Sequence, residues 1–341
     1  MLRMRPALRR AIDLLLESDS DEEFEDTRRP RFIRERCAHF EDLDDVDFVR
    51  RFRLSKRCAL IVLELIEQKL EFESDKNFSV SPINQLLLTL RYYATGCTQI
   101  SAGDFSGVSE STSHRIIHRV SSAIAELYRQ FIYFPRNERE KQETVGAFYA
   151  IARFPRVIGA IDCTHIKIRS PGGEHAEYYR CRKGYFSLNC QAICNSNLEF
   201  MDLVARWPGS VHDVTIFDNS TQKGNFEAGL YGDSLLVGDG GYASKRYLMR
   251  PLSDPTTPEE QLYNQSQIRT RNPVERMFGV WKRRFPVLAL GITVKLDKAM
   301  IIIVACAVLH NILRKNGDPQ PPDDSALELP MPWDALIAYG Q

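Results

Sequence analysis

The spacing of apolar residues predicts helices in the first half of the chain. Between Val49 and Leu70 the apolar positions recur with the period of one helical face. A second helical stretch begins at Ser81 and Pro82, two residues that suit a helix start, and it runs toward Gly96. We therefore expect a bundle of helices ahead of the rest of the chain.

The next segment is similar to a helix-turn-helix unit. A turn at Gly107 and Val108 precedes Ser109, the predicted cap of a helix that carries Arg115 and Arg119. These two arginines are the candidate DNA contacts of the unit. However, Ser106 stands where such units usually have an apolar residue, and the helix carries little positive charge. A helix hairpin that only packs is therefore an equal alternative.

Short strands are predicted from residue 157 onward, because the apolar and β-branched residues now form brief runs. The predicted strands cover residues 157–161, 166–169, 189–194, 200–207 and 235–237. Three further helices are expected. One begins at Asp213, one contains Glu275 and has Asn272 as its cap and Pro273 at its first position, and one runs from Leu296 to Lys315. This order predicts an α/β fold on one sheet, with three adjacent strands forming a meander.

The charged residues are balanced over the whole chain but unevenly distributed along it. The chain has 45 basic and 45 acidic residues, so any attraction to nucleic acid depends on where the charges gather. Acids gather at residues 17–26 and 41–47, in a stretch with too few apolar residues to fold, whereas basic residues gather between Arg269 and Arg284. We predict a disordered acidic tail over residues 1–45, a helical domain over 46–145, an α/β core over 146–318 and an extension over 319–341.

The eight cysteines form no CxxC pair, and no signal peptide precedes them. Free thiols in a reducing, intracellular compartment are therefore expected. The apolar run from Ala299 to Leu309 is shorter than the ~20 residues that cross a bilayer. We interpret this run as a buried core helix and expect no membrane partner.

Four acidic residues are candidates for metal-dependent chemistry. Asp162 and Asp239 each follow a short apolar run, and we place both at strand ends, with Gly240 and Gly241 allowing an unusually tight backbone after Asp239. Glu275 is expected in the first turn of its helix, and Asp213 at the start of another. Each acid also has an ordinary interpretation. The aspartates could bind backbone amides, Glu275 could pair with Arg271 or Arg276, and Asp213 could cap its helix.

Two basic groups accompany these acids. The first lies among tyrosines and a phenylalanine, a composition that suits phosphate contact with ring stacking, and the second lies on the segment around Glu275. Their candidate DNA-binding residues are Arg182, Lys183, Arg276, Lys282 and Arg283. A solvated hairpin and plain surface charge are the alternatives. His165 and His212 flank two of the acids, and we interpret both as orienting partners rather than catalytic groups.

Several motifs, in a consistent order over residues 155–312, resemble the catalytic domain of PIF/Harbinger transposases, and especially the nucleases derived from Harbinger transposases. The motifs are VIGAIDCTHIKIRSP, YYRCRKGYFSLNCQ, WPGSVHD, LLVGDGGY, NPVERMFGVWKRRFPVL and CAVLHNI. The resemblance implies a ribonuclease H-like core with helices on both sides of a sheet. It also implies a DDE triad of Asp162, Asp239 and Glu275, with Asp213 at a further acidic position that binds metal or supports the site.

The function implied by this resemblance is a DNA endonuclease that uses two divalent cations, Mg²⁺ or Mn²⁺, to hydrolyse phosphodiester bonds. Oxygen ligands such as these carboxylates suit both metals. The alternatives are an active transposase, a DNA-binding scaffold without productive cleavage and, more remotely, another two-metal hydrolase such as a phosphatase. The resemblance also implies a Myb-like partner protein for DNA recognition and nuclear import. We accordingly expect the protein in the nucleus and also in the cytoplasm, with oligomers allowed.

Overall fold

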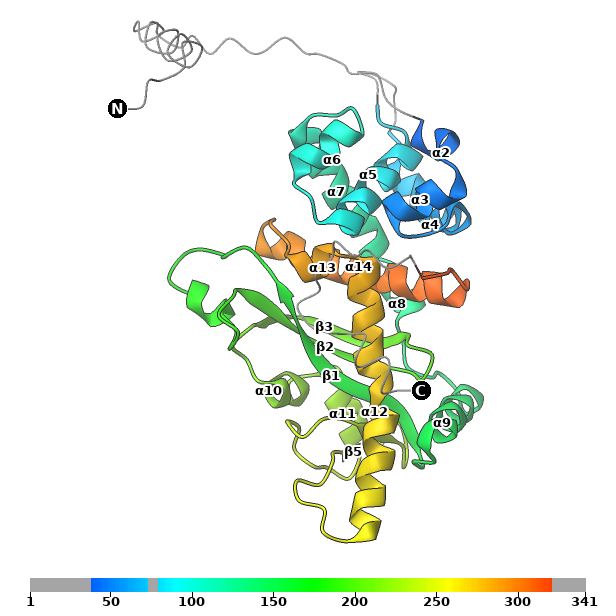
Figure 1. The fold of residues 1–341 in the computed structure, drawn as a ribbon, viewed down its shortest axis with the longest axis vertical. Helices are drawn as coiled ribbons and strands as arrows, with labels where there is room; N and C mark the ends of the chain where they lie inside the picture. Colours follow the sequence, from blue (N-terminus) through cyan, green and yellow to red (C-terminus); the bar gives the residue numbers. More distant parts are fainter. Residues whose placement is uncertain (1–37, 73–78, 321–341) are drawn as a thin grey trace, which may run out of the picture. The chain divides into compact units, whose positions relative to one another are not determined.

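A computed structural model describes residues 38–72 and 79–320 of the chain (Figure 1). The tail predicted over residues 1–45 falls mainly outside these residues. Its last part, where it is described, contains the short helix α2 (His39–Asp42) and the start of α3 (Asp45–Phe52). The C-terminal extension lies almost wholly outside the described residues. The boundaries at residues 145 and 318 stay predictions.

The N-terminal part is helical, as its apolar spacing predicts. The helix predicted from Val49 to Leu70 is two helices, because Arg53 adopts a left-handed conformation (φ 64°) that ends α3 before α4 begins. Ser55 then caps α4 (Lys56–Leu70) by accepting a hydrogen bond from the Cys58 amide. The next helix, α5 (Pro82–Thr95), begins after Ser81 and ends at Gly96, in agreement with the prediction.

The predicted helix–turn–helix segment consists of α6 (Gln99–Phe105) and α7 (Glu110–Ala125). Ser109 caps α7 through the Thr112 amide, as expected. Gly103 allows the close turn, since a Cβ there would lie 2.8 Å from the carbonyl oxygen of Val108. Ser106 is buried at the end of α6, where the sequence suggested an apolar residue. The turn and the Ser109 cap are therefore confirmed, while the helix-turn-helix assignment and DNA binding by this unit stay predictions.

The sheet has five strands in the order β3-β2-β1-β4-β5. Strand β1 (Val157–Lys167) pairs antiparallel with β2 (Ser187–Cys194), which pairs antiparallel with β3 (Phe200–Pro208). The predicted meander is thus confirmed, although the first two predicted strands are parts of one continuous strand. Strands β4 (Leu235–Val237) and β5 (Leu248–Met249) continue the sheet in parallel with β1.

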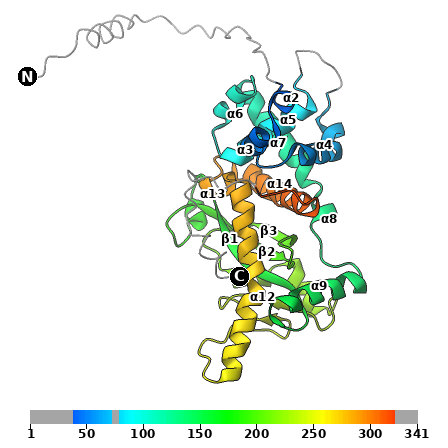
Figure 2. The same ribbon diagram turned by 45° about the vertical axis from the view of Figure 1, so that its right-hand side comes forward.

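Helices cover the two faces of the sheet. On one face, α9 (Glu138–Ala152) and the long α12 (Pro258–Arg284) pack against β1 (Figure 2). On the other face lie α10 (Asp213–Asp218), which packs on β2, and α11 (Thr221–Glu227), which packs beside α10. The remaining short helices are α8 (Tyr128–Phe131), the 3-10 helix η1 (Ala176–Tyr179) and α13 (Val287–Leu290). This mixed sheet with helices on both faces confirms the α/β class.

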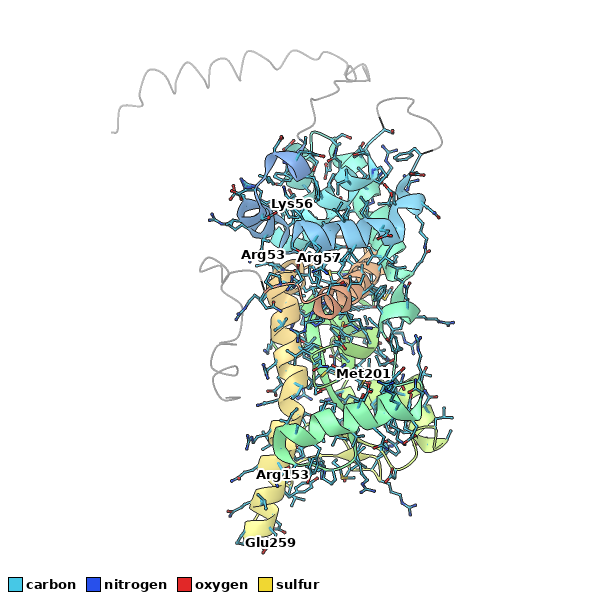
Figure 3. The ribbon with its side chains drawn as sticks, turned by 90° about the vertical axis from the view of Figure 1, so that its right-hand side faces the viewer. Arg53, Lys56, Arg57, Arg153, Met201 and Glu259 are labelled. Carbon is cyan, nitrogen blue, oxygen red and sulfur yellow. The ribbon has the colours of Figure 1, made fainter. Side chains whose placement is uncertain are left out.

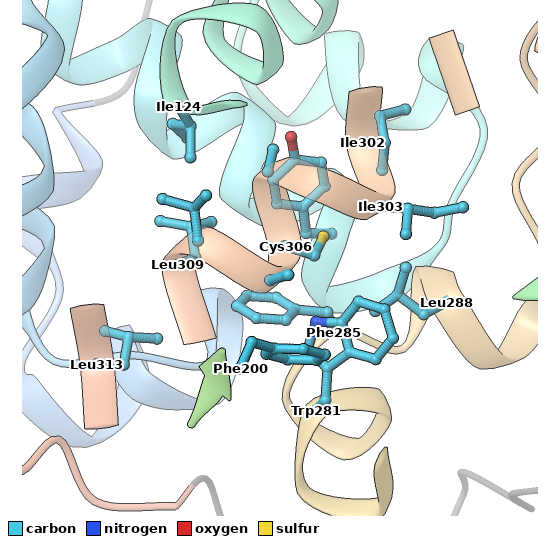
Figure 4. Close-up of a cluster of buried hydrophobic side chains, with 14 of the residues drawn as sticks. Ile124, Phe200, Trp281, Phe285, Leu288, Ile302, Ile303, Cys306, Leu309 and Leu313 are labelled. Atoms are coloured by element: carbon cyan, nitrogen blue, oxygen red, sulfur yellow. The ribbon is translucent and has the colours of Figure 1, made fainter. Parts of the chain in front are cut away.

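The predicted core helix is α14 (Leu296–Lys315). Its buried side chains lie between α7 and the sheet, with Leu309 between Ile124 of α7 and the rings of Phe200 and Trp281 (Figure 4). Among the described helices, α14 alone is long and apolar enough to cross a membrane by length and composition. Its packing inside the protein is that of a core helix. The seven cysteines within the described residues have free thiols, as predicted.

His310 of α14 makes the stability of this core depend on pH. Its ring is buried, it packs edge-on against Phe200, and its Nε2 donates to the Leu198 carbonyl (2.7 Å). Burial lowers the pKa of His310 to about 3. The folded state therefore favours the neutral ring, and stability falls as pH drops below the ordinary histidine pKa of about 6.5.

We expect His310→Gln to reduce the pH dependence of unfolding, because a glutamine amide can donate to the same carbonyl without titrating. Between pH 7 and pH 5, His310 should cost the wild type about 2 kcal/mol that the variant does not lose. Urea unfolding of both proteins at the two pH values measures the difference. Equal losses in the two proteins would show that His310 does not titrate in this way.

Candidate active site

Asp162 lies in the middle of β1 rather than at a strand end, which corrects the prediction. The parallel partner β4 stops at Val237, opposite Ala160, so Asp162 is placed just past the point where β4 ends. Its carboxylate faces α12, whereas the neighbouring Cys163 points to the other face of the sheet and contacts Tyr242, because side chains alternate along a strand. The short apolar run before Asp162 showed where β4 pairs, and not where β1 ends.

Asp239 follows β4 by two residues, so its predicted position after a strand is confirmed. The Gly241 amide donates to Asp239 Oδ1 (3.0 Å), and neither Gly240 nor Gly241 has a positive φ, so the expected unusual backbone is absent at both. Gln267 of α12 is fully buried and donates to the Gly238 carbonyl (2.7 Å), which fixes the end of β4 against this helix. No pattern in the sequence indicates this contact.

Glu275 lies in the second half of α12, and its predicted place in a first turn is wrong. The helix begins at Pro258, where Thr257 and Glu260 form a capping box, and it continues through Pro273. The polar residues before Asn272 hid the first half of the helix from the hydrophobic pattern. Figure 3 labels Glu259 near the first end of α12 and Arg53 close to the other end.

Arg271 joins two of the predicted triad acids. It is one helical turn before Glu275, and its guanidinium donates through Nη1 to Asp162 Oδ2 (2.8 Å) and through Nη2 to Glu275 Oε1. Only 15% of the Arg271 side chain is exposed, so both ion pairs have little contact with water. The Glu275 pair was one of the alternatives given by the sequence. The contact with Asp162 could not be predicted, because it joins α12 to β1.

Asp162, Asp239 and Glu275 lie close enough to interact electrostatically. The pKa of Asp162 is raised to about 7, chiefly by burial and also by Asp239 and Glu275, while Arg271 and the Cys163 amide oppose the shift. Asp239 and Glu275 also favour the charged form of Arg271. Asp162, Asp239 and Glu275 therefore form one cluster around Arg271 on the α12 face of the sheet.

The donor set of this cluster suits a hard divalent cation, since it consists of carboxylate oxygens. Arg271, however, forms ion pairs with Asp162 and Glu275. Within residues 38–72 and 79–320, no group of three His, Cys, Asp or Glu side chains is arranged to hold a metal ion. The chemistry of the site therefore fits the implied metals, but its carboxylates are held by an arginine in this structure.

Asp213 lies on the other face of the sheet, in a separate polar group. Its Oδ1 accepts from Asn189 (2.9 Å), and its backbone oxygen accepts from Gln191 (3.3 Å). Gln191 also donates to the hydroxyl of Tyr242, which contacts the Cys163 thiol. Asp213 opens α10, but His212 is the cap residue and no side-chain cap bond is made there. The structure thus does not bring Asp213 together with the other three acids.

The first predicted basic group lies around His165. Arg182 donates to Nδ1 of His212 (2.9 Å), and the positive charges of Lys183 and Arg182 both disfavour protonation of His165. Lys282 of α12 donates to Thr164 Oγ1 (2.6 Å) and to the His165 carbonyl (3.1 Å), and burial lowers the pKa of Lys282 to about 8. The fold therefore brings Lys183 and Lys282 into electrostatic contact beside the strand that carries Asp162.

The other predicted DNA contacts are dispersed. Arg276 is exposed beside Glu275, and Arg283 is partly buried near the end of α12. Arg115 is exposed, but its guanidinium folds back onto its own helix at the Ser111 carbonyl. Arg119 stacks on the Phe72 ring at 4.2 Å. DNA contact by these four arginines stays a prediction.

Comparison with known proteins gives a consistent result. A family model described as "DDE superfamily endonuclease" matches residues 161–311, a range that contains all four candidate acids. The chain is 33% identical over 280 residues to "Putative nuclease HARBI1" of Bos taurus, across 81% of this chain and 80% of the relative. The protein of the same name in Homo sapiens matches with the same identity and coverage.

A plant relative is more distant. "Protein ALP1-like" of Arabidopsis thaliana is 25% identical over 306 residues, across 83% of this chain and 74% of the relative. No solved structure matches the chain significantly.

Proposed function

Because the chain belongs to the PIF/Harbinger family of DDE superfamily endonucleases, we propose that it is a divalent-metal-dependent DNA endonuclease. The observation that supports this proposal best is the convergence of Asp162, Asp239 and Glu275 from a strand, a loop and a helix onto one buried arginine. Clustered carboxylates repel one another unless a cation lies among them, and such clusters are frequent at functional sites. We also propose that the core is ribonuclease H-like, which agrees with its antiparallel meander extended by parallel strands.

In this proposal Asp162, Asp239 and Glu275 hold the metal ions, Mg²⁺ or Mn²⁺. Two such cations, when bound, would activate a water, neutralise phosphate charge and stabilise the leaving oxygen. Arg271 compensates the carboxylates in the metal-free protein and must release Asp162 and Glu275 before they can coordinate a cation. Lys183, which is exposed, binds a phosphate of the DNA near the cut, while Lys282 supports β1 through Thr164 and the His165 carbonyl.

A second candidate function is a DNA-binding or scaffold protein without productive cleavage. The ion pairs of Arg271 with two of the triad acids favour this function, since the described side chains are not arranged to bind metal. The plant relative is also not named as a nuclease. In either case we propose, from the family resemblance, a Myb-like partner protein and a location in both nucleus and cytoplasm. Asp213 would then support the site from the opposite face of the sheet rather than bind metal.

Cleavage of DNA tests the two functions. Purified protein should cut duplex DNA with Mg²⁺ or Mn²⁺ and not with EDTA, and Asp162→Asn and Glu275→Gln should each reduce the rate at least about a hundredfold, as expected for loss of a metal-site contact. Glu259→Gln, on the exposed first turn of α12, is the matched control and should cut normally.

The assay should be run with and without the Myb-like partner. Metal-independent cutting, or equal rates for the Asp162→Asn variant and the wild type, would contradict the metal-triad mechanism. DNA binding without cutting under every condition would favour the scaffold. Cleavage of small phosphate esters but not DNA would indicate a different two-metal hydrolase.

A further inference from the structure

A large cleft lies between the α6–α7 hairpin and the far end of β1. Its cavity volume is about 810 Å³, and its walls come from the first turns of α6 and α7, the segment after β1, and the start of α14. Among its lining residues are Gln99, His114, Arg169 and Lys295. None of these residues belongs to the acid cluster, so the cleft is a separate feature of the molecule.

The cleft has a fixed, positively charged wall. His114 donates through Nδ1 to the Gln99 amide oxygen (3.0 Å) and accepts through Nε2 from Lys298 (2.6 Å), so one neutral imidazole joins α6, α7 and α14. Burial lowers the pKa of His114, and the charges of Lys298 and Lys295 lower it further, in agreement with a local excess of positive charge. Glu110 is the one acidic residue among the lining side chains of the described chain.

Two cations in the cleft are available to a ligand. Arg169 and Lys295 are exposed, and within the described part of the chain neither side chain has an ion-pair partner. The backbone that carries Arg169 is held in place, since its amide donates to the Ile292 carbonyl (3.0 Å) and Ile168 is bonded to Phe186. Arg169 therefore lies on a hydrogen-bonded backbone, and no ion pair within residues 38–72 and 79–320 neutralises it or Lys295.

Strand β1 connects the acid cluster to this cleft. From Asp162 the chain runs past His165, where Lys183 and Lys282 gather, then through the exposed Lys167 to Arg169. The stem of Lys167 lies beside Gly291, four residues before Lys295. Seven residues of extended backbone cover about 23 Å, and that length corresponds to roughly seven nucleotides of one strand of duplex DNA.

We propose that this cleft is a second contact for the nucleic-acid backbone, in which Arg169 and Lys295 bind phosphates of the duplex whose other part lies at the acid cluster. The inference rests on the proposed DNA substrate and adds the path that the duplex takes. The exposed basic residues Lys183, Lys167, Arg169 and Lys295 would line that path. The contact is sequence-independent, because it involves the phosphate backbone and not the base edges.

The test compares DNA binding in a protein that cannot cut. Asp162→Asn and Asp162→Asn/Arg169→Gln/Lys295→Gln are titrated with a labelled 30-base-pair duplex, between 50 and 200 mM salt. Loss of two phosphate contacts should lower the slope of log affinity against log salt by about 1.8 and weaken binding most at low salt. Both substituted side chains are exposed, so the melting temperature should stay unchanged.

The matched control carries Arg50→Gln and Arg139→Gln on the Asp162→Asn background. Both arginines are exposed and lie outside the cleft, on α3 and α9, so the salt slope should be retained. An unchanged slope in the Arg169/Lys295 variant, while Asp162→Asn alone binds DNA, would overturn the second contact and leave the nuclease proposal intact. If Asp162→Asn binds no DNA either alone or with the Myb-like partner, both proposals fail together.

Discussion

Replacement of Arg284 by methionine is expected to lower the free energy of unfolding by about 3–5 kcal/mol, the cost of leaving one partner of a buried ion pair alone. Arg284 ends α12 and is 1% exposed. Its guanidinium donates to Asp318 Oδ2 (2.6 Å) and to the carbonyl oxygens of Arg53 and Pro319 (both 2.9 Å). The other Asp318 oxygen accepts a hydrogen bond from the Ser55 amide. Arg284→Met would therefore leave a buried carboxylate without its ion-pair partner.

Urea unfolding of the wild type and Arg284→Met measures this loss. The double variant Arg284→Met/Asp318→Leu is the control, because removing both charges together should recover a large part of the stability. If the double variant is no more stable than Arg284→Met, the unpaired Asp318 carboxylate is not the cause of the lost stability. A loss below about 1 kcal/mol in Arg284→Met would place this arginine among ordinary surface charges.

Replacement of Arg271 by glutamine is expected to destabilise the metal-free protein by about 3 kcal/mol, at the lower end for a buried pair because the site keeps some contact with water. The same change should strengthen metal binding, since Arg271 no longer competes for Asp162 and Glu275. Added Mn²⁺ should therefore stabilise the variant more than the wild type at equal concentration.

Thermal unfolding with EDTA and with increasing Mn²⁺ measures both effects, and calorimetric titration gives the affinity directly. Arg276→Gln is the matched control, because Arg276 is exposed one residue after Glu275 and has no contact with Asp162 in the described structure. Arg271 does not compete with the metal if Mn²⁺ stabilises the control more than Arg271→Gln. The same conclusion follows if Mn²⁺ stabilises Arg271→Gln and the wild type equally.

Most elements could be predicted from the sequence, because their boundaries are set by local chemistry. Ser81 and Gly96 mark the two ends of α5, and α14 extends over the residues expected from its apolar positions. The start of α12 was missed for a local reason as well. Its first half is polar, and Pro273, which usually opens a helix, lies inside it.

The three acids that cluster around Arg271 could be singled out from the sequence, whereas their arrangement in space could not. Asp162, Asp239 and Glu275 were identified by their flanking motifs, but the side of the sheet on which each acid lies depends on strand register. That register separates Asp213 from the other three and brings Arg271 onto Asp162. Arg284 shows the same limit, because a basic cluster gave no sign that one of its members is buried.

The position of α14 has a consequence for how this protein can change over generations. The helix contacts α7 of the helical part and β3 of the sheet at the same time, and Arg284 ties both parts to the segment after α14. A substitution in α14 must therefore suit two partners at once. Exchange of the helical part alone between related genes would leave α14 facing a foreign surface, so we expect the two parts to be inherited as one unit.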